Sequence, residues 1–223
     1  MYLIMWILEN SAITDYGHYT TTGPTPLMLK LSDCTLSAFT HYGFVCHGQR
    51  YGVLVKGSIE GIQDILVRFA SNCQWSFYFD NSYCDCRRQF EQAKEKIDRE
   101  GQWLIVFAHD QHGKWVGIED HWKIYTEWLK NDWELVVESY EKLWFKEDYR
   151  DYNDFVIILK HFGLSSIRLL SNNPRRISFL EKAWITIHRE SIEEPIRQEL
   201  KQEYRSKKRK LSHLLDVSDE DLS

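Results

Sequence analysis

Short β-branched segments alternate with amphipathic helical segments along this chain, and the alternation limits the possible folds more than any other feature. Residues 51–57 (YGVLVKG) and 64–70 (DILVRFA) are rich in valine, isoleucine and leucine and enclose the turn-like SIEGIQ. They are predicted to be two strands that pair with each other. Further strands are predicted at residues 103–109 (WLIVFAH), 167–171 (IRLLS) and 184–189 (WITIHR).

Between these strands, apolar residues recur at helical spacing. Phe90, Ala93 and Ile97 lie among charged residues after Cys86 and predict an amphipathic helix that stops at Gly101. A long helical stretch follows Gly113, with one face formed by Trp122, Tyr125 and Leu129. Further helices are predicted at residues 135–143, 152–162, 175–182 and 192–215.

Strands followed by helix-strand alternation predict an α/β fold, in which a mixed sheet is layered with helices. No repeat or linker divides the chain, so we assign one domain to residues 1–215 and expect the acidic residues 216–223 to form a frayed, disordered tail. With 223 residues, 43% of them hydrophobic, the chain is long enough to bury a sizeable core.

Charge and hydropathy exclude several classes of protein. The chain has 28 basic and 33 acidic residues and a net charge of −5, which excludes a basic nucleic-acid coat protein. The first eight residues (MYLIMWIL) lack the cationic start of a signal peptide, and no apolar run approaches the roughly 18 residues of a membrane span. The basic run at 207–210 is interpreted as a solvated helix face. We expect a soluble, cytoplasmic protein that binds neither nucleic acid nor membranes.

Three of the five cysteines form the pattern C-x10-C-x-C, at Cys73, Cys84 and Cys86. Three thiolates suit zinc. With only three protein ligands the fourth position is open to a water molecule, which would make the site catalytic, whereas a structural zinc takes four protein ligands. His109 or His112 could supply that fourth ligand, and the spacing alone does not decide between the two alternatives.

The segment Ser171 to Arg176 (SNNPRR) follows a predicted strand and opens a predicted helix. Asn173 is a natural N-cap and Pro174 suits the first helical position. Free N–H groups at the helix start and two arginines could bind phosphate, although an ordinary capped helix would have the same local pattern. Residues 148–152 (DYRDY) form a charged aromatic cluster, which alone also fits a helix start.

Taken in order, these motifs resemble the GTP cyclohydrolase II family, whose zinc enzymes open the guanine ring of GTP at the start of riboflavin synthesis. The resemblance rests on Arg68, the three cysteines with Asp85 between the last two, and Gln89 on the next helix. It continues through the residues that match the family's later motifs, which are Tyr125, Glu138, Asp148, Arg150, Leu169 to Arg176 and Lys210 to Leu215. It covers nearly the whole chain from about Ile13.

The resemblance implies a role for each matching position. Cys73, Cys84 and Cys86 would bind zinc, and Mg²⁺ would bind the pyrophosphate oxygens. Tyr125, Asp148 and Arg150 would be catalytic, with Tyr125 near C8 of the purine and Arg150 at the α-phosphorus as nucleophile or as a stabiliser of charge. Glu138 is the candidate acceptor for the guanine edge. The substrate-binding set is Arg68, Ser71, Gln89, Gly113, Lys114, Glu138, Ser171 and Arg176.

Departures from the family pattern cluster at substrate-contacting positions. Ala70 and Asn72 replace a histidine and a glutamate, His112 replaces a glutamate, and Lys114 replaces an arginine. Val136 stands where the family has a nucleotide-contacting threonine. Lys114 keeps its charge but loses the forked geometry of arginine. Trp75 adds apolar bulk beside the metal ligands and is equally explained by core filling.

The resemblance implies a zinc-dependent hydrolase that opens the imidazole ring of GTP at C8 and releases formate and pyrophosphate. The product would be a 2,5-diamino-6-ribosylaminopyrimidinone 5'-phosphate. A divergent paralogue could act on another purine nucleotide or stop at a formamidopyrimidine. A third alternative is a zinc-stapled nucleotide-binding protein without turnover. Family members are commonly dimers, so a homodimer is expected.

Overall fold

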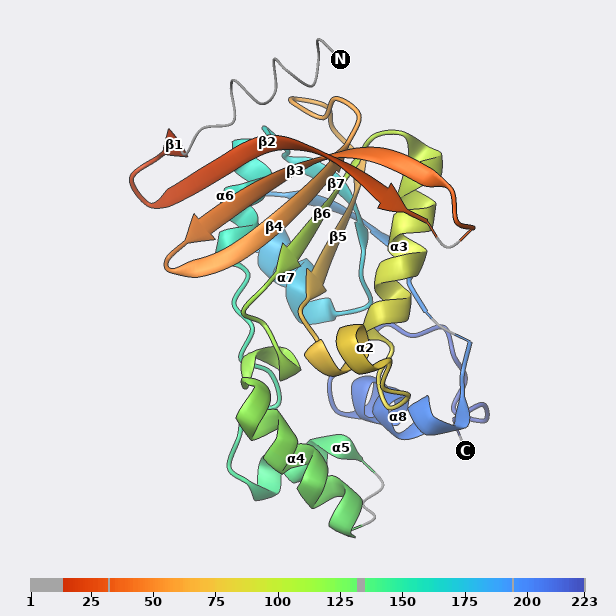
Figure 1. Ribbon diagram of the computed structural model, residues 1–223. Helices are drawn as coiled ribbons and strands as arrows, with labels where there is room; N and C mark the ends of the chain where they lie inside the picture. Colours follow the sequence, from red (N-terminus) through yellow and green to blue (C-terminus); the bar gives the residue numbers. More distant parts are fainter. Residues whose placement is uncertain (1–13, 32, 132–134, 194, 223) are drawn as a thin grey trace.

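The computed structural model describes residues 14–31, 33–131, 135–193 and 195–222 and is built around an eight-stranded mixed sheet (Figure 1). Its strand order is β1-β2-β3-β4-β6-β5-β7-β8. The predicted α/β class and mixed sheet are confirmed. The strands are β1 (Thr14–Asp15), β2 (Tyr19–Lys30), β3 (Leu36–Cys46), β4 (Gln49–Lys56), β5 (Ile65–Ser71), β6 (Trp103–Ala108), β7 (Ser166–Leu170) and β8 (Thr186–Glu190).

The sheet changes character at β6. Strands β1 to β4 form an antiparallel meander that continues onto β6, whereas β6, β5, β7 and β8 are parallel. We predicted that β4 and β5 pair with each other, and this was wrong, because β6 lies between them. Five of the six residues of β6 are buried, as expected for a strand covered on both faces. Strands β2 and β3 were not predicted from the sequence.

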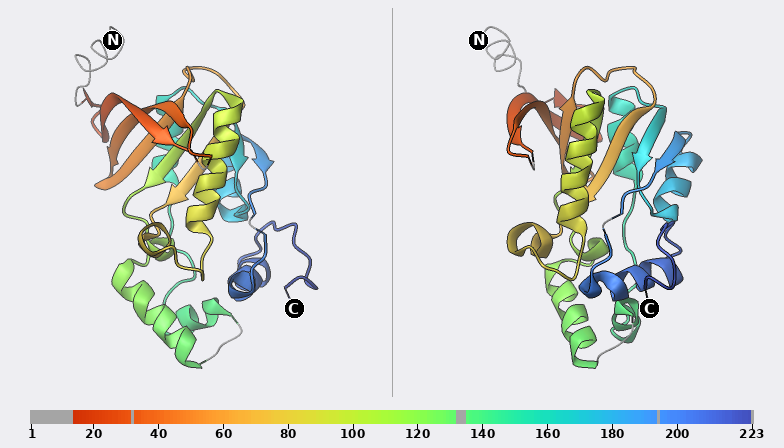
Figure 2. Two further views of the ribbon diagram at one scale, coloured as in Figure 1. Left: turned by 45° about the vertical axis from the view of Figure 1, so that its right-hand side comes forward. Right: turned by 90° about the vertical axis from the view of Figure 1, so that its right-hand side faces the viewer.

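Helices cover both faces of the sheet (Figure 2). Along β6, Trp103 and Ile105 pack with Ala93 and Ile97 of helix α3 (Cys86–Glu100). The alternate residues of β6 pack instead with helices α6 (Asn153–His161) and α7 (Pro174–Lys182). These three helices and their boundaries agree closely with the sequence prediction. The core therefore lies in two layers, one on each side of the parallel strands.

Helices α4 (Ile118–Asn131) and α5 (Val136–Lys142) project beyond the sheet and pack against each other near the short helix α2 (Gln74–Phe79) (Figure 1). Tyr125 is buried on α4 as predicted, but Trp122 and Leu129 are exposed. The buried face consists of His121, Ile124, Tyr125 and Trp128. Their i, i+3, i+4 and i+7 spacing is that of one helix face. The buried face of α4 is therefore rotated about the helix axis relative to the predicted face.

The predicted helix over residues 192–215 is much shorter in the structure. A 3-10 turn (Gln198–Leu200) leads into α8 (Lys201–Arg209). Pro195 cannot donate a helical hydrogen bond, which disfavours an earlier start. After α8 the chain turns back, and Leu214 N donates to Asn172 O at 2.8 Å. The tail that we expected to fray returns to α8, where Leu222 is buried against Leu200 and Tyr204.

Among the described residues, none of the helices has both the length and the apolar character needed to cross a bilayer. The apolar segment MYLIMWIL, and Ile13 at the start of the family resemblance, lie outside the described residues. The expectations attached to them stay predictions.

Candidate active site

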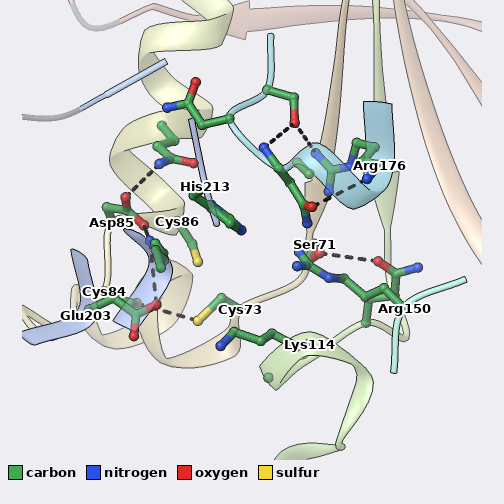
Figure 3. Close-up of a pocket in the computed structure, with 18 of the residues that line it drawn as sticks. Ser71, Cys73, Cys84, Asp85, Cys86, Lys114, Arg150, Arg176, Glu203 and His213 are labelled. Atoms are coloured by element: carbon green, nitrogen blue, oxygen red, sulfur yellow. Dashed lines mark hydrogen bonds and ion pairs between the residues drawn. The ribbon is translucent and has the colours of Figure 1, made fainter. Parts of the chain in front are cut away.

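A cavity opens where the parallel strands β5, β6 and β7 end. In parallel sheets, ligands bind at the carboxyl ends of the strands. Cys73 follows β5, Gln111 follows β6, and Ser171 follows β7, so the ends of the three strands bring distant parts of the chain to one place. Figure 3 shows the cysteines on one side of this cavity and Arg150 and Arg176 on the other. We call these sides the metal end and the phosphate end.

The metal end consists of three cysteine side chains that could hold one ion. The Sγ atoms of Cys73, Cys84 and Cys86 all lie within 4.8 Å of one another, and those of Cys73 and Cys84 are 3.6 Å apart. A hydrogen bond with Cys73 and burial raise the pKa of Cys84 to about 12. Thiols held this closely ionise together only when a cation compensates their charge. A soft divalent ion such as zinc fits this set of ligands.

Neither His109 nor His112 belongs to this group of ligands in the described part of the chain. The Gln74 backbone N–H donates to His112 Nδ1 at 3.1 Å. His112 Nε2 lies 2.9 Å from His121 Nδ1. Both ring nitrogens of His112 are therefore engaged in hydrogen bonds. The described residues then supply three protein ligands, which favours the open site over the four-ligand staple.

Asp85, between two of the cysteines, is the centre of a buried polar network. Gln89 Nε2 donates to Asp85 Oδ2 at 2.6 Å, and Arg68 Nη2 donates to Gln89 Oε1 at 2.7 Å. Tyr204 OH and Lys207 Nζ reach the same carboxylate from α8, each at 3.0 Å. Burial disfavours the charged form of Asp85, but the charge of Lys207 together with the hydrogen bonds from Lys207 and Tyr204 outweighs it, and the pKa is lowered. Asp85 is therefore ionised and fixed.

At the phosphate end, Asp148 and Arg150 form a two-pronged ion pair. Arg150 Nε donates to Oδ1 at 2.8 Å and Nη2 donates to Oδ2 at 2.6 Å. Burial works against the charge of Arg150, yet Tyr152 and Asp148 hold its pKa above the ordinary value. Arg150 lines the cavity and stays positively charged. Its ion pair with Asp148 fixes the orientation of the guanidinium group.

The loop after β7 adds a second cation to the phosphate end. Asn173 Oδ1 accepts from the backbone N–H groups of Arg175 and Arg176 at 3.0 and 3.4 Å, which confirms the predicted N-cap. Arg176 is buried, and Nη1 donates to Phe69 O at 3.3 Å. Arg175, by contrast, is exposed.

Three buried donors at the cavity have no hydrogen-bond partner among the described residues. They are Arg68 Nε, Arg176 Nε and Gln111 Nε2. Burial, with the charge of Arg176, lowers the pKa of Arg68 to about 10. Unpaired buried donors are rare in native proteins and call for an explanation. Here they suit a ligand that is rich in acceptor oxygens.

A comparison of the sequence with known families identifies the chain. The sequence model of the family described as GTP cyclohydrolase II matches residues 27–192. The chain belongs to the GTP cyclohydrolase II family.

Curated relatives agree with this membership. The riboflavin biosynthesis protein RibBA of Bacillus cereus is 37% identical over 165 residues, which cover 74% of this chain and 41% of the relative. The RibBA proteins of Bacillus mycoides and Bacillus cytotoxicus are each 36% identical over the same shares. The chain therefore matches less than half of the length of these relatives.

The structure brings most of the predicted GTP cyclohydrolase II positions together. Tyr125 is buried, and its ring lies edge-on to Trp75 at 4.8 Å. Burial and the charge of Glu203 raise its pKa well above the ordinary value, so the hydroxyl stays protonated. The cavity is lined by these predicted site residues: Arg68, Ser71, Cys73, Cys84, Cys86, Gln89, Gly113, Lys114, Tyr125, Arg150, Ser171 and Arg176.

Gly113 and Lys114 follow β6 with backbone angles that place both beside the cavity. Gly113 has φ +57°, and a Cβ there would lie 2.6 Å from Cγ of His121, so glycine allows the histidine ring to approach. Lys114 Nζ lies 5.0 Å from the centre of the Tyr140 ring, and burial lowers its pKa. A shielded ammonium group thus faces the cavity where the family has an arginine.

Two predicted residues lie outside the cavity lining. Asp148 is buried and acts on the cavity through Arg150. Glu138 caps its own helix, because its Oε2 accepts from the Leu135 backbone N–H at 3.2 Å. Among the altered positions, Ala70 and Val136 line the cavity, whereas the Asn72 side chain donates to His109 O at 2.9 Å.

Sequence reasoning assigned no site role to several residues that line the cavity, among them His121, Glu203, Lys207 and His213. Glu203 and Lys207 are four residues apart on α8, and their charged atoms are 3.5 Å apart. His213 lies in the segment that matches the family's closing motif, and this match could have identified it as a site residue. The others carried no local signal, since they reach the cavity only through tertiary packing.

Proposed function

We propose that this chain is a zinc-dependent hydrolase that opens the imidazole ring of GTP at C8. It releases formate and pyrophosphate and leaves a 2,5-diamino-6-ribosylaminopyrimidinone 5'-phosphate. The observation that carries the proposal is a single cavity with a three-thiol cluster at one end and the Asp148–Arg150 pair with unpaired arginine donors at the other. Ring opening and phosphate chemistry need these two environments side by side.

Cys73, Cys84 and Cys86 would hold the metal. Zinc bound by three thiolates supplies Lewis acidity and an activated water at its open position. The chain itself lines the cavity with Tyr125 and His121, whose rings pack on Trp75. The neutral hydroxyl of Tyr125 can donate a hydrogen bond, or a proton, to the nitrogen that is released when the ring opens.

Arg150 would stabilise the charge that develops on the phosphate, and Asp148 would orient it. A guanidinium held in its charged form is a poor nucleophile, so we favour electrostatic stabilisation over covalent attack. The unpaired Nε atoms of Arg68 and Arg176 would donate to further phosphate oxygens. Mg²⁺ would neutralise the leaving pyrophosphate.

Guanine needs an acceptor for its N1–H and its amino group. Glu138 was predicted for this role, although one of its oxygens accepts from the Leu135 backbone. Glu203 lines the cavity directly and is 8% exposed. Its only ion-pair partner in the described part of the chain is Lys207. We therefore propose Glu203, in addition to Glu138, as a candidate acceptor for the N1–H and amino groups of guanine.

One observation favours a second candidate function. Val136 lines the cavity with an apolar side chain where the family has a nucleotide-contacting threonine. A lost hydrogen bond changes the preference of a site among similar ligands. A divergent enzyme that takes another purine nucleotide, or stops at a formamidopyrimidine, is the alternative that this substitution supports. A homodimer stays a prediction.

The test is to purify the chain with its zinc quantified, incubate it with GTP and Mg²⁺, and identify the products by mass spectrometry. A Cys84→Ser variant is the control. We expect formate and pyrophosphate from the wild type, and neither zinc nor formate with the variant. Zinc-loaded protein that returns GTP unchanged would contradict the proposal, and turnover of another purine nucleotide would support the alternative.

A further inference from the structure

The outer support of the metal end comes from a part of the chain outside the family match. The family model ends at residue 192, whereas α8 spans Lys201–Arg209. From α8, Lys207 Nζ and Tyr204 OH reach the two carboxylate oxygens of Asp85. Asp85 stands between two cysteines of the metal end, Cys84 and Cys86, and is joined to each of them by a peptide bond.

Asp85 is 2% exposed, and its partners come from two directions. Gln89 holds one oxygen from within α3, where the helix follows directly after the Cys84–Cys86 segment. Lys207 and Tyr204 hold the carboxylate from the opposite side. Two anchors from different elements leave the peptide between the cysteines little freedom to rotate. That freedom decides whether both Sγ atoms can face one ion.

Charge gives Lys207 a second role at the same place. Three thiolates around a divalent cation keep one net negative charge, and Asp85 adds another within the same buried region. Lys207 is the cation in direct contact with Asp85, and its side chain is 13% exposed. A buried anion is costly unless it is paired. Arg68 does not contact Asp85 directly: it bonds to Gln89 and acts on the carboxylate through its charge.

The helix that carries Lys207 is itself firmly placed. Leu200, Tyr204 and Leu222 form a buried cluster on one side of α8. Lys208 donates to Val217 O in the returning tail at 2.6 Å, and Leu214 N donates to Asn172 O beside the cavity. The position of Lys207 is thus fixed by packing around α8 as well as by its ion pairs with Asp85 and Glu203.

We propose that Lys207 is a positioning residue of the metal site: by holding Asp85, it keeps the Cys84–Cys86 segment in ligand geometry and offsets the charge of the thiolates. Partners in this outer position are worth about 10- to 100-fold in metal affinity. The inference rests on the metal ion of the proposed function but not on the reaction.

The test compares zinc affinity, by competition with a chromophoric chelator, for the full chain and its Lys207→Met variant without nucleotide. We expect about 10- to 100-fold weaker zinc binding for Lys207→Met and partial recovery for Lys207→Arg. Lys208→Met is the matched control, since Lys208 is on the same helix but contacts the tail. Circular dichroism reports folding of each variant.

Affinity of Lys207→Met within twofold of wild type, or an equal loss in Lys208→Met, would overturn the proposal. If Lys207→Met does not fold, zinc affinity is measured instead for Tyr204→Phe. This variant removes one hydrogen bond to Asp85 and keeps the aromatic ring. Several-fold weaker zinc binding then supports the proposal and unchanged binding overturns it. Wild-type protein that binds zinc without turning over GTP would contradict the proposed reaction alone, and a wild type without zinc affinity would overturn both.

Discussion

The two ends of the cavity differ in how completely their polar groups are paired. At the metal end, both oxygens of Asp85 have partners, and Gln89 is bonded on both of its amide atoms. At the phosphate end, Arg176 has a buried Nε with no partner among the described residues. The metal end is therefore organised by the protein itself, whereas the phosphate end is left incomplete until a ligand supplies acceptors.

This difference parallels the sequence changes. The three cysteines, Asp85 and Gln89 match the family, whereas Lys114, His112 and Val136 depart from it. A buried network whose central carboxylate is held by several partners penalises the replacement of any of them. Donors that meet a ligand can be replaced one at a time, with a change in preference rather than a loss of the fold.

The largest expected effect comes from removing the metal. Chelation should abolish formate release and leave binding of a non-hydrolysable GTP analogue within a few-fold of the untreated protein, because the arginine donors do not depend on zinc. Measurement of formate tests the loss of ring opening, and fluorescence titration tests the retained binding of the analogue. If the protein lost analogue binding together with its zinc, the two ends of the cavity would depend on each other, and the contrast between them would be wrong.

Arg150→Lys should damage the phosphate end alone. Lysine keeps the charge but cannot form the two-pronged contact with Asp148. We expect pyrophosphate release to fall roughly 100- to 1,000-fold, as for loss of a charge-stabilising donor. Zinc content, measured by atomic absorption, should equal that of wild type. A variant that also loses zinc would show that the ends are coupled.

Glu203→Gln sharpens the comparison from the side of the metal end, where Glu203 pairs with Lys207. If Glu203 accepts from guanine, kcat/KM for GTP should fall about 10-fold, the worth of a hydrogen bond to a charged group. The loss should be smaller for ITP, which lacks the amino group, and equal for dGTP. Equal losses for all three nucleotides would assign Glu203 a different role.

The smallest effect is expected at the helix cap that shapes the phosphate end. Asn173→Ala removes the acceptor for the N–H groups of Arg175 and Arg176. The free energy of unfolding should fall by about 1 kcal/mol, measured by urea denaturation. A variant as stable as wild type would mean that other contacts hold the start of α7.

Local patterns predicted what depends on neighbours in sequence. The boundaries of α3, the Asn173 cap and the set of three cysteines all follow from spacing over a few residues. The pairing of β4 with β6 does not, because strand partners are chosen by burial of both faces across the sheet. Strands β2 and β3, with their mixed polar and apolar residues, carry a weaker periodic signal than the buried strands.

The candidate site divides in the same way. Cys73, Cys84 and Cys86 were identified by spacing, and family resemblance supplied Tyr125 and Arg150. Glu203 and Lys207 belong to a charged helix that looks solvated from sequence alone, and the prediction of one helix over 192–215 hid the turn that brings α8 to the cavity. No local rule reports a contact between Asp85 and Lys207.

The same contact gives the site an order of assembly during synthesis. Asp85 and Lys207 are 122 residues apart, a stretch that a ribosome takes about 6 to 24 s to translate at 5–20 residues per second. All three cysteines leave the ribosome before Lys207 exists. An ion captured in that interval would lack the support of Lys207, so we expect a nascent chain to exchange its metal more readily than the finished fold.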